Sequence, residues 1–409
     1  MRGTTTSSWL GREECGFADL HVHPDHTRTR HWLLQRGHSV TVLTTARSDG
    51  TSGHQDAPYP TWFLPAPAGR YSAAWWRESA AAFARLHAAE PFDVIRSQSA
   101  GALGYLANLQ PQLHVPVVAI MHGSTLGALR QQAYAWPSPR SLALVAAYLP
   151  TALLFLWRWR HLGPRLAAVV VPSPELLEHN RRELHLPVDR FRVVPLGVDL
   201  DLFAPNPMAG AAARARLGIP PGAQVLLMAG RLTPQKGASV ALAALRRLAE
   251  CHPELVLLFV GSGRQTAKLQ RTAGQAGLNE RVRFLGQVSQ RELAVYYNAA
   301  DICLFPWLGW EVFPLVLLEA LACGRPVIAS RIGSAPSILG MAEVGVLVTP
   351  GAVDALATAI KRLVATPASA QAMGLAARRL AEASFSIEAM VARTEAVLAS
   401  CAHRGDGKP

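Results

Sequence analysis

The sequence is 409 residues long, more than one hydrophobic core usually organises, so the length predicts two domains of ordinary size. Hydrophobic residues make up 50% and charged residues 17%, which excludes a disordered chain. A net charge of +12 fits an anionic partner, and of nucleotide, nucleic acid and anionic lipid we expect a nucleotide rather than nucleic acid. The alternative is an ordinary solvated basic surface.

The cysteine pattern and the N-terminus bear on the compartment. The cysteines stand at positions 15, 251, 303, 323 and 401 without a CxxC pair, which argues against a zinc site and against disulfide stapling. The first residues, MRGTTTSSWLGREE, lack the apolar core of a signal peptide. We therefore expect a cytoplasmic protein.

Short β-branched runs alternate with longer helical stretches along the chain, which predicts βαβ units and parallel sheets. The strands expected in the first half are SVTVLTT, TWFLP, FDVIRS, VPVVAIM, LAAVVVPS and FRVVPLG, with an alanine-rich helix over residues 72–90. The second half repeats this rhythm with AQVLLMAG, ELVLLFVG, RVRFLG, DICLFP, PVIAS and VGVLVT. The fold class predicted is α/β, with two doubly wound, Rossmann-like domains that face a central crevice.

The cluster of Gly, Asp, Asn and Pro in LGVDLDLFAPNP predicts the seam between the domains. We expect an N-terminal domain over residues 1–200, a C-terminal domain over 208–385, and a helix with a tail over 386–409 that packs back on the first domain. Residues 1–14 are polar, so we expect the first strand of the first sheet to be missing. The sheet would then open at HSVTVLTT and the protein would be poorly stable.

One apolar run, from Leu142 to Trp157, is shorter than the roughly 20 residues that span a bilayer, and it contains Pro150. Arg158, Arg160 and other cations follow it, so it can lie on a membrane surface. The alternative is an ordinary buried helix. The localisation expected is thus cytoplasmic, with peripheral contact at the inner face of the membrane.

Two carboxylates flank the predicted start of a helix in the segment DICLFPWLGWEVFPLVLLEALACGRPVIAS. Glu311 lies in the loop after a strand, and Glu319 lies within the helix that opens near Pro314. Carboxylates can accept hydrogen bonds from sugar hydroxyls, and the free amides of Leu315 and Val316 can bind phosphate oxygens. The pattern indicates a nucleotide-sugar site; alternatively, both glutamates are merely solvated.

A second candidate site is the stretch GRLTPQKG, which follows the strand VLLMA directly and precedes the helix predicted over 238–249. Arg231 and Lys236 lie on either side of this strand-to-helix turn, where a diphosphate would meet two cations and a helix dipole. Basic loop residues are often only solvated, but two of them at such a turn, in a domain that also holds the acidic pair, favour a function.

Residues 193–385 resemble the GT4 family of retaining glycosyltransferases, which have the GT-B fold. The matching stretches are VVPLGVDLDLF, GRLTPQKG, FVGSG, RVRFLGQV, the run from Glu311 to Glu319, EALACGRPVIAS and VGVLVTPG. The resemblance implies that Arg231 and Lys236 bind the donor diphosphate and that Glu319 holds the ribose. Glu311 would face the donor sugar.

In the first half, the resemblance implies that His122, after the strand VPVVAIM, reaches the donor sugar and that the backbone of Gly16 contacts the donor. We accordingly assign Glu311, His122, Arg231 and Lys236 to catalysis. The donor-binding residues expected are Gly16, Arg231, Lys236, Glu311, Phe313, Leu315, Val316 and Glu319. The reaction implied is transfer of a hexose from a UDP- or GDP-sugar to an acceptor hydroxyl, with no cofactor and no metal ion. The acceptor class, whether lipid, glycan or small molecule, stays open.

The sequence also departs from the family pattern. The loop after Glu311 commonly reads Gly-Phe-Gly, whereas here it is Val312, Phe313 and Pro314, and Pro314 has no N–H to donate. Ser337 stands where the family often carries another glutamate.

Two rival functions stay open. His21 and His23, with His26, His31 and His38 nearby, resemble the HxH metal ligands of zinc-dependent amidohydrolases. A catalytically weak GT-B protein that only binds a nucleotide sugar is the other alternative. Bound zinc would indicate the first, and an absence of donor hydrolysis would indicate the second.

Overall fold

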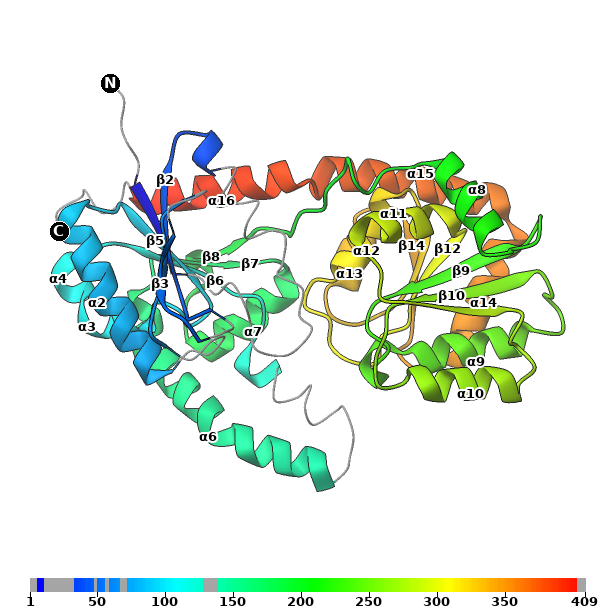
Figure 1. Ribbon diagram of the computed structural model, residues 1–409, viewed down its shortest axis with the longest axis horizontal. Coiled ribbons are helices and arrows are strands. Elements are labelled where there is room, and N and C mark those ends of the chain that lie inside the picture. The colour runs from blue at the N-terminus through cyan, green and yellow to red at the C-terminus, as the bar shows by residue number, and fades with distance from the viewer. Residues whose placement is uncertain are drawn as a thin grey trace. The chain divides into compact units, whose positions relative to one another are not determined.

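A computed structural model describes residues 6–10, 33–47, 50–55, 59–66, 72–127 and 139–402. The chain divides into two compact units. The first unit takes Met1–Leu129, Leu144–Val194 and Glu388–Pro409, and the second takes Arg130–Ala143 and Pro195–Ile387. Each unit is built around its own sheet (Figure 1).

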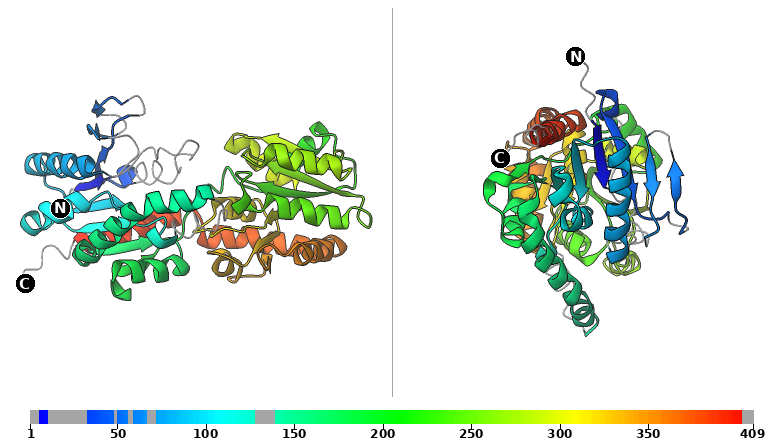
Figure 2. Two further views of the ribbon diagram at one scale, coloured as in Figure 1. Left: turned by 90° about the horizontal axis from the view of Figure 1, so that it is seen from below. Right: turned by 90° about the vertical axis from the view of Figure 1, so that its left-hand side faces the viewer.

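The sheet of the first unit has the order β3-β4-β2-β1-β5-β6-β7-β8, and all its pairs are parallel except β3 with β4. Its strands are β1 (Thr6–Leu10), β2 (Ser39–Thr44), β3 (Gly53–Gln55), β4 (Thr61–Phe63), β5 (Val94–Gln98), β6 (Val117–Ile120), β7 (Ala168–Val171) and β8 (Phe191–Val193). The helices that belong to it are α2 (Ala73–Ala89), α3 (Leu103–Asn108), α4 (Gln110–Leu113), α6 (Pro139–Leu162) from Leu144 on, α7 (Pro174–Leu184) and α16 (Ile387–Ala402) from Glu388 on, with 3₁₀ turns η1 (Gly163–Arg165) and η2 (Val188–Arg190). The views in Figure 2 show the strands of this sheet and helices α2 and α6 beside them.

The prediction that this sheet lacks its first strand is wrong. β1 lies between β2 and β5 and pairs with both in parallel, with Trp9 opposite Val42 on one side and Arg96 on the other. Its sequence, TSSWL, carries little apolar signal, because most of its residues are small and polar. Main-chain hydrogen bonds to two neighbours form whatever the side chains are, so the expected gap and the poor stability derived from it have no basis here.

The sheet of the second unit is entirely parallel, in the order β11-β10-β9-β12-β13-β14. Its strands are β9 (Gln224–Ala229), β10 (Leu255–Val260), β11 (Val282–Gly286), β12 (Ile302–Phe305), β13 (Val327–Ser330) and β14 (Gly345–Val348). Its helices are α8 (Pro207–Arg216), α9 (Ala238–Leu248), α10 (Thr266–Gln275), α11 (Gln290–Ala299), α12 (Leu315–Ala322), α13 (Ala335–Leu339), α14 (Val353–Ala365) and α15 (Pro367–Ser384), with the 3₁₀ turn η3 (Pro234–Lys236).

Both faces of this sheet are covered by helices, as the alternation along β9 requires. Val225 and Leu227 belong to the core shared with α11 and α12, while Leu226 and Met228 belong to the core shared with α9 and α14. Figure 1 shows these two helical layers on opposite sides of the strands. The fold class is therefore α/β with two doubly wound, Rossmann-like domains, as the sequence predicts.

The last helix, α16, contributes to the first unit through Glu395. Its carboxylate lies 2.6 Å from Arg36 Nε and 2.8 Å from His38 Nε2. Arg36 and His38 lie just before β2. Glu395 of α16 therefore binds the segment that leads into this strand.

Candidate functional site

The first site loop follows β9 and leads into α9 through the turn η3. Gly237, which ends the turn and caps α9, has φ +76°, a left-handed conformation that favours glycine. A Cβ at this position would also collide with the backbone carbonyl of Pro306, which lies directly after β12. The glycine thus lets the end of β12 approach the start of α9 closely.

The second site loop follows β12 and leads into α12. Pro314 is the residue before the helix, and its carbonyl accepts a hydrogen bond from the N–H of Leu317. Leu315 and Val316, half-buried, form the first turn. Among the described residues, no side chain caps α12. The first backbone N–H groups of the helix are therefore available to bind a ligand at its N-terminus.

Backbone hydrogen bonds hold the two loops together. The carbonyl of Gln235 accepts from the N–H groups of Leu308, at 2.8 Å, and Gly309, at 3.1 Å. Across this junction, Lys236 Nζ lies 2.8 Å from Glu311 Oε1, and both side chains are mostly buried, at 20% and 12% exposure. The structure therefore brings together two predicted residues, 75 positions apart in sequence, from two different strand ends.

The loop that carries Glu311 has a support that the sequence analysis missed. The N–H of Ser334 donates to the backbone carbonyl of Glu311 at 3.1 Å. Gly333, with φ +60°, lies so close to Glu311 that a Cβ would overlap that carbonyl. The signal in the sequence is the Gly-Ser pair at 333–334, two residues after the strand PVIAS, where a parallel neighbour of β12 ends.

Glu319 is buried, at 7% exposure, so the alternative of a solvated helix residue is wrong. Its Oε2 accepts a hydrogen bond of 3.0 Å from the hydroxyl of Tyr297, which also lies 3.0 Å from the carbonyl of Val316. Burial, together with the nearby Glu319 carboxylate, raises the pKa of Tyr297 well above its ordinary value. The hydroxyl therefore keeps its proton and holds one carboxylate oxygen of Glu319 in place.

Tyr297 is a second residue that the sequence analysis missed. It lies near the end of α11 and is fully buried, in contact with the core that α12 shares. A buried tyrosine needs a hydrogen-bond partner for its hydroxyl. A tyrosine within the helical stretch that precedes DICLFP was therefore the sequence signal for a polar partner near this strand.

Arg231 and Phe313 are the remaining predicted residues of the second unit, and Ser337 is the position that departs from the family pattern. Arg231 is exposed, two residues after β9. Phe313 packs edge-on against Phe385, with ring centroids 6.2 Å apart. Ser337 donates to the carbonyl of Ser334 at 3.0 Å, so its hydroxyl serves the turn that begins α13.

In the first unit, His122 follows β6, and its Nε2 lies 3.0 Å from Oε1 of Gln98 at the end of β5. Gln98 is itself buried. The contact places both side chains at the carboxyl edge of a parallel sheet, where ligands of such folds commonly bind. Gly16 lies outside the described residues.

Of the five histidines of the amidohydrolase alternative, the structure describes His38. His21, His23, His26 and His31 lie outside the described residues, and His38 pairs with Glu395. In the described ranges, no group of three His, Cys, Asp or Glu side chains is placed to hold a metal ion.

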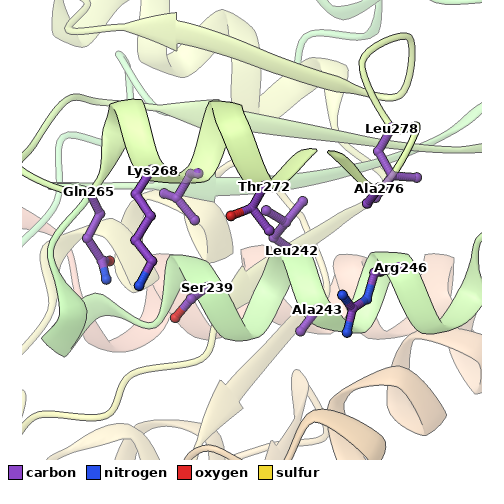
Figure 3. A pocket seen from close by; sticks show the side chains of 10 residues that line it. Ser239, Leu242, Ala243, Arg246, Gln265, Lys268, Thr272, Ala276 and Leu278 are labelled. Carbon is purple, nitrogen blue, oxygen red and sulfur yellow. The ribbon is translucent and has the colours of Figure 1, made fainter. Parts of the chain in front are cut away.

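A hollow lies between α9 and α10, lined by apolar side chains such as Leu242 and Leu269 and by the cations Arg246 and Lys268 (Figure 3). None of the predicted site residues lines it. The hollow is therefore separate from the loops that carry Lys236 and Glu311.

Two family models and several relatives match the chain. Residues 211–380 match the family described as glycosyl transferases group 1, and residues 27–202 match glycosyltransferase family 4. The chain is 32% identical over 337 residues to D-inositol 3-phosphate glycosyltransferase of Xylanimonas cellulosilytica, a match that covers 77% of this chain and 76% of that protein. It is 37% identical over 178 residues to a GDP-mannose-dependent alpha-(1-6)-phosphatidylinositol monomannoside mannosyltransferase of Mycolicibacterium smegmatis, covering 42% and 46%.

Two solved structures are similar over nearly the whole chain. Sucrose-phosphate synthase from Thermosynechococcus elongatus has a TM-score of 0.75 at 26% identity, covering 97% of this chain and 98% of that one. HepE of Anabaena, in complex with UDP and glucose, has a TM-score of 0.71 at 19% identity, covering 97% and 100%, and supports the fold alone.

The two Rossmann-like domains thus form a GT-B fold. The chain belongs to the group 1 glycosyltransferases of family GT4, and it is a glycosyltransferase enzyme. Within the described ranges, none of the helices combines the length and the apolar character that a bilayer crossing requires.

Proposed function

We propose that this chain transfers a hexose from a UDP- or GDP-sugar to an acceptor hydroxyl, with retention of anomeric configuration and without a metal ion. The observation that carries the proposal is the Lys236–Glu311 pair, held between the ends of β9 and β12 beside the start of α12. A cation, a carboxylate and free helix amides in one place suit a ligand that has both phosphates and hydroxyls.

In this proposal the diphosphate lies against Lys236, Arg231 and the first amides of α12. Negative charge grows on the diphosphate as its bond to the sugar breaks, and fixed positive groups lower the barrier by stabilising that charge. The ammonium of Lys236 has three N–H donors, so it can serve the phosphate while it keeps its bond to Glu311. Arg231 is exposed and has room to close on the phosphate.

The two glutamates have different parts. Glu319, one of whose oxygens is fixed by Tyr297, holds the ribose hydroxyls of the nucleotide. Glu311, anchored by its backbone to Ser334, orients the sugar and acts as a stabiliser rather than a covalent nucleophile. His122, from the first unit, contacts the donor sugar. The attack then occurs on the same face that the diphosphate leaves, which retains the configuration.

For the acceptor we propose a phosphorylated polyol or its lipid-bound form. Several relatives are named for D-inositol 3-phosphate, and one for a phosphatidylinositol mannoside. The net charge of +12 suits an acceptor that carries phosphate. The proposal includes a cytoplasmic location with peripheral contact at the inner face of the membrane.

The test begins with calorimetry and continues with transfer assays. Glu319→Gln should weaken binding of plain UDP or GDP, whereas Glu311→Gln should leave that affinity nearly unchanged and mainly impair transfer. Equal nucleotide affinity in wild type and Glu319→Gln would contradict the ribose assignment. Transfer in the presence of EDTA and the anomeric configuration of the product, read by NMR, test the metal and stereochemical parts. Donor binding without hydrolysis or transfer would favour a protein that only binds nucleotide sugars.

A further inference from the structure

Helix α6 has one face that packs against its own unit. Ala152 and Trp159 are buried, at 0% and 3% exposure. Phe155 meets the ring of Trp76 on α2 edge-on, with centroids 5.8 Å apart, and the guanidinium of Arg158 lies 4.0 Å over the same ring. The sequence alternative of an ordinary buried helix describes this face only.

The opposite face of α6 is apolar and exposed. Leu149, Leu153 and Trp157 follow one another at a spacing of four residues, which places them on one side of the helix, and Leu154 lies beside them. Their exposures are 44%, 56%, 59% and 45% in the order Leu149, Leu153, Trp157, Leu154. We call these four side chains the α6 face.

The α6 face is a concentration and not a scatter of single residues. In the described part of the chain ten large hydrophobic side chains are exposed, and four of them belong to this one helix. Single exposed apolar residues are normal on soluble proteins, but a contiguous group marks a surface that meets a partner. Figure 1 and the right-hand view of Figure 2 show α6 running outward from the sheet of its unit.

The charge next to the α6 face indicates the kind of partner. Arg160 and His161 lie three and four residues after Trp157 on α6, Arg165 lies in η1 after the helix, and all three are exposed. No Asp or Glu occurs anywhere between Asp93 and Glu175, an interval with six arginines. A stretch of chain without acidic residues, with a tryptophan between apolar and cationic side chains, matches the boundary of an anionic bilayer better than a protein partner.

We propose that the α6 face docks on the surface of an anionic lipid bilayer, with its leucines and Trp157 in the interface and Arg160 among the headgroups. Helix α6 would lie in the plane of the interface, in keeping with the lack of a spanning helix in the described ranges. This inference deepens the proposed function. It rests on that function in one respect only, which is that the docked enzyme acts on an acceptor at the membrane surface. Docking itself needs neither donor nor acceptor.

The experiment is co-sedimentation of the full chain, free of nucleotide, with vesicles. One set contains phosphatidylcholine alone, and the other an equimolar mixture of phosphatidylcholine and phosphatidylglycerol. We expect binding to the mixed vesicles only, with release as salt rises, because salt screens the contact of arginine with the headgroups. Equal recovery with both vesicle types would overturn the proposal.

Variants show which surface binds. The double variant Leu153→Glu/Trp157→Glu should bind mixed vesicles at least about tenfold more weakly, since it removes two apolar groups and adds two negative charges. Arg160→Glu, which leaves the apolar face intact, should reduce the same binding by a smaller factor. The matched control is Leu375→Glu on α15, where the exposure is 58% against 59% for Trp157. This control should bind as the wild type does.

Two results would count against the α6 face. Vesicle binding unchanged in the double variant and in Arg160→Glu would overturn the proposal. A change in sedimentation velocity from dimer to monomer in the double variant, with vesicle binding unchanged, would show that a second copy of the chain covers this face instead. Because vesicle binding is measured without substrate, it can fail while calorimetry still supports the donor site, and the reverse also holds.

Discussion

The two units secure the carboxyl ends of their strands in different ways. In the second unit the loops after β9 and β12 are joined by their backbones, through the carbonyl of Gln235 and the close contact of Gly237 with Pro306. In the first unit the ends of β5 and β6 are joined by the backbone, where the N–H of Ser99 donates to the carbonyl of Ile120 at 2.9 Å, and also by the side chains of His122 and Gln98. Backbone contacts fix a geometry that few substitutions can alter, whereas side-chain contacts can be replaced residue by residue. The loops after β9 and β12 are thus held by main-chain contacts at Gln235 and Gly237, whereas the His122–Gln98 contact of the first unit can change with either residue.

The largest expected effect tests whether the two units fold independently of each other. Deleting residues 1–10 removes β1 and leaves β2 and β5 without their shared neighbour. We expect this to cost the first unit most of its stability, of which a domain has only about 5–15 kcal/mol. The second unit should keep its nucleotide affinity. Calorimetric unfolding and a UDP or GDP titration on the same sample measure both. A first unit that still unfolds at the wild-type temperature would contradict the central role of β1.

The next largest effect should come from the two cations in the loop after β9 of the second unit, Lys236 and Arg231. Lys236→Ala removes the cation that we propose faces the leaving diphosphate, and it should lower turnover at least tenfold, about 1.4 kcal/mol of barrier, with the fold intact. Arg231→Ala should act in the same direction. Lys268→Ala, in the hollow between α9 and α10, is the matched control and should leave turnover unchanged. Wild-type kinetics in both Lys236→Ala and Arg231→Ala would sink the diphosphate assignment.

A smaller effect should come from the first unit. His122→Ala removes the hydrogen bond that we propose His122 makes to the donor sugar, and it should lower transfer by about fivefold, roughly 1 kcal/mol, without changing the affinity for UDP or GDP. Steady-state kinetics together with calorimetry separate the two quantities. Loss of nucleotide affinity in this variant would mean that the division of labour between the units is drawn wrongly.

The smallest effect should come from Tyr297, whose hydroxyl positions the carboxylate of Glu319. Tyr297→Phe keeps the buried ring and removes only the hydroxyl that binds Glu319. We expect the affinity for the nucleoside diphosphate to fall by about threefold, which corresponds to about 0.7 kcal/mol, with kcat nearly unchanged. Tyr296→Phe on the neighbouring position is the control. A fall in kcat with unchanged affinity would assign Tyr297 a role other than positioning Glu319.

The sequence by itself determined most of the strands, since each expected apolar run contains one. It also predicted Arg231, Lys236, Glu311 and Glu319 as candidate site residues, because short motifs at strand ends preserve both residue type and spacing. Such signals are local: a buried parallel strand is apolar along its length, and a phosphate-binding turn needs its glycine and cations within a few residues.

Only the tertiary structure decided the features that depend on distant neighbours. The strand β1 is defined by hydrogen bonds to β2 and β5, not by its own polar residues, and β3 is an exposed edge strand that β4 alone pairs. The bond from Tyr297 to Glu319 and the anchor of Ser334 on Glu311 join residues on separate elements. The exposed face of α6 follows from which side of the helix Trp76 happens to cover. Pairing, support and exposure are properties of contacts between segments, so no single stretch of sequence records them.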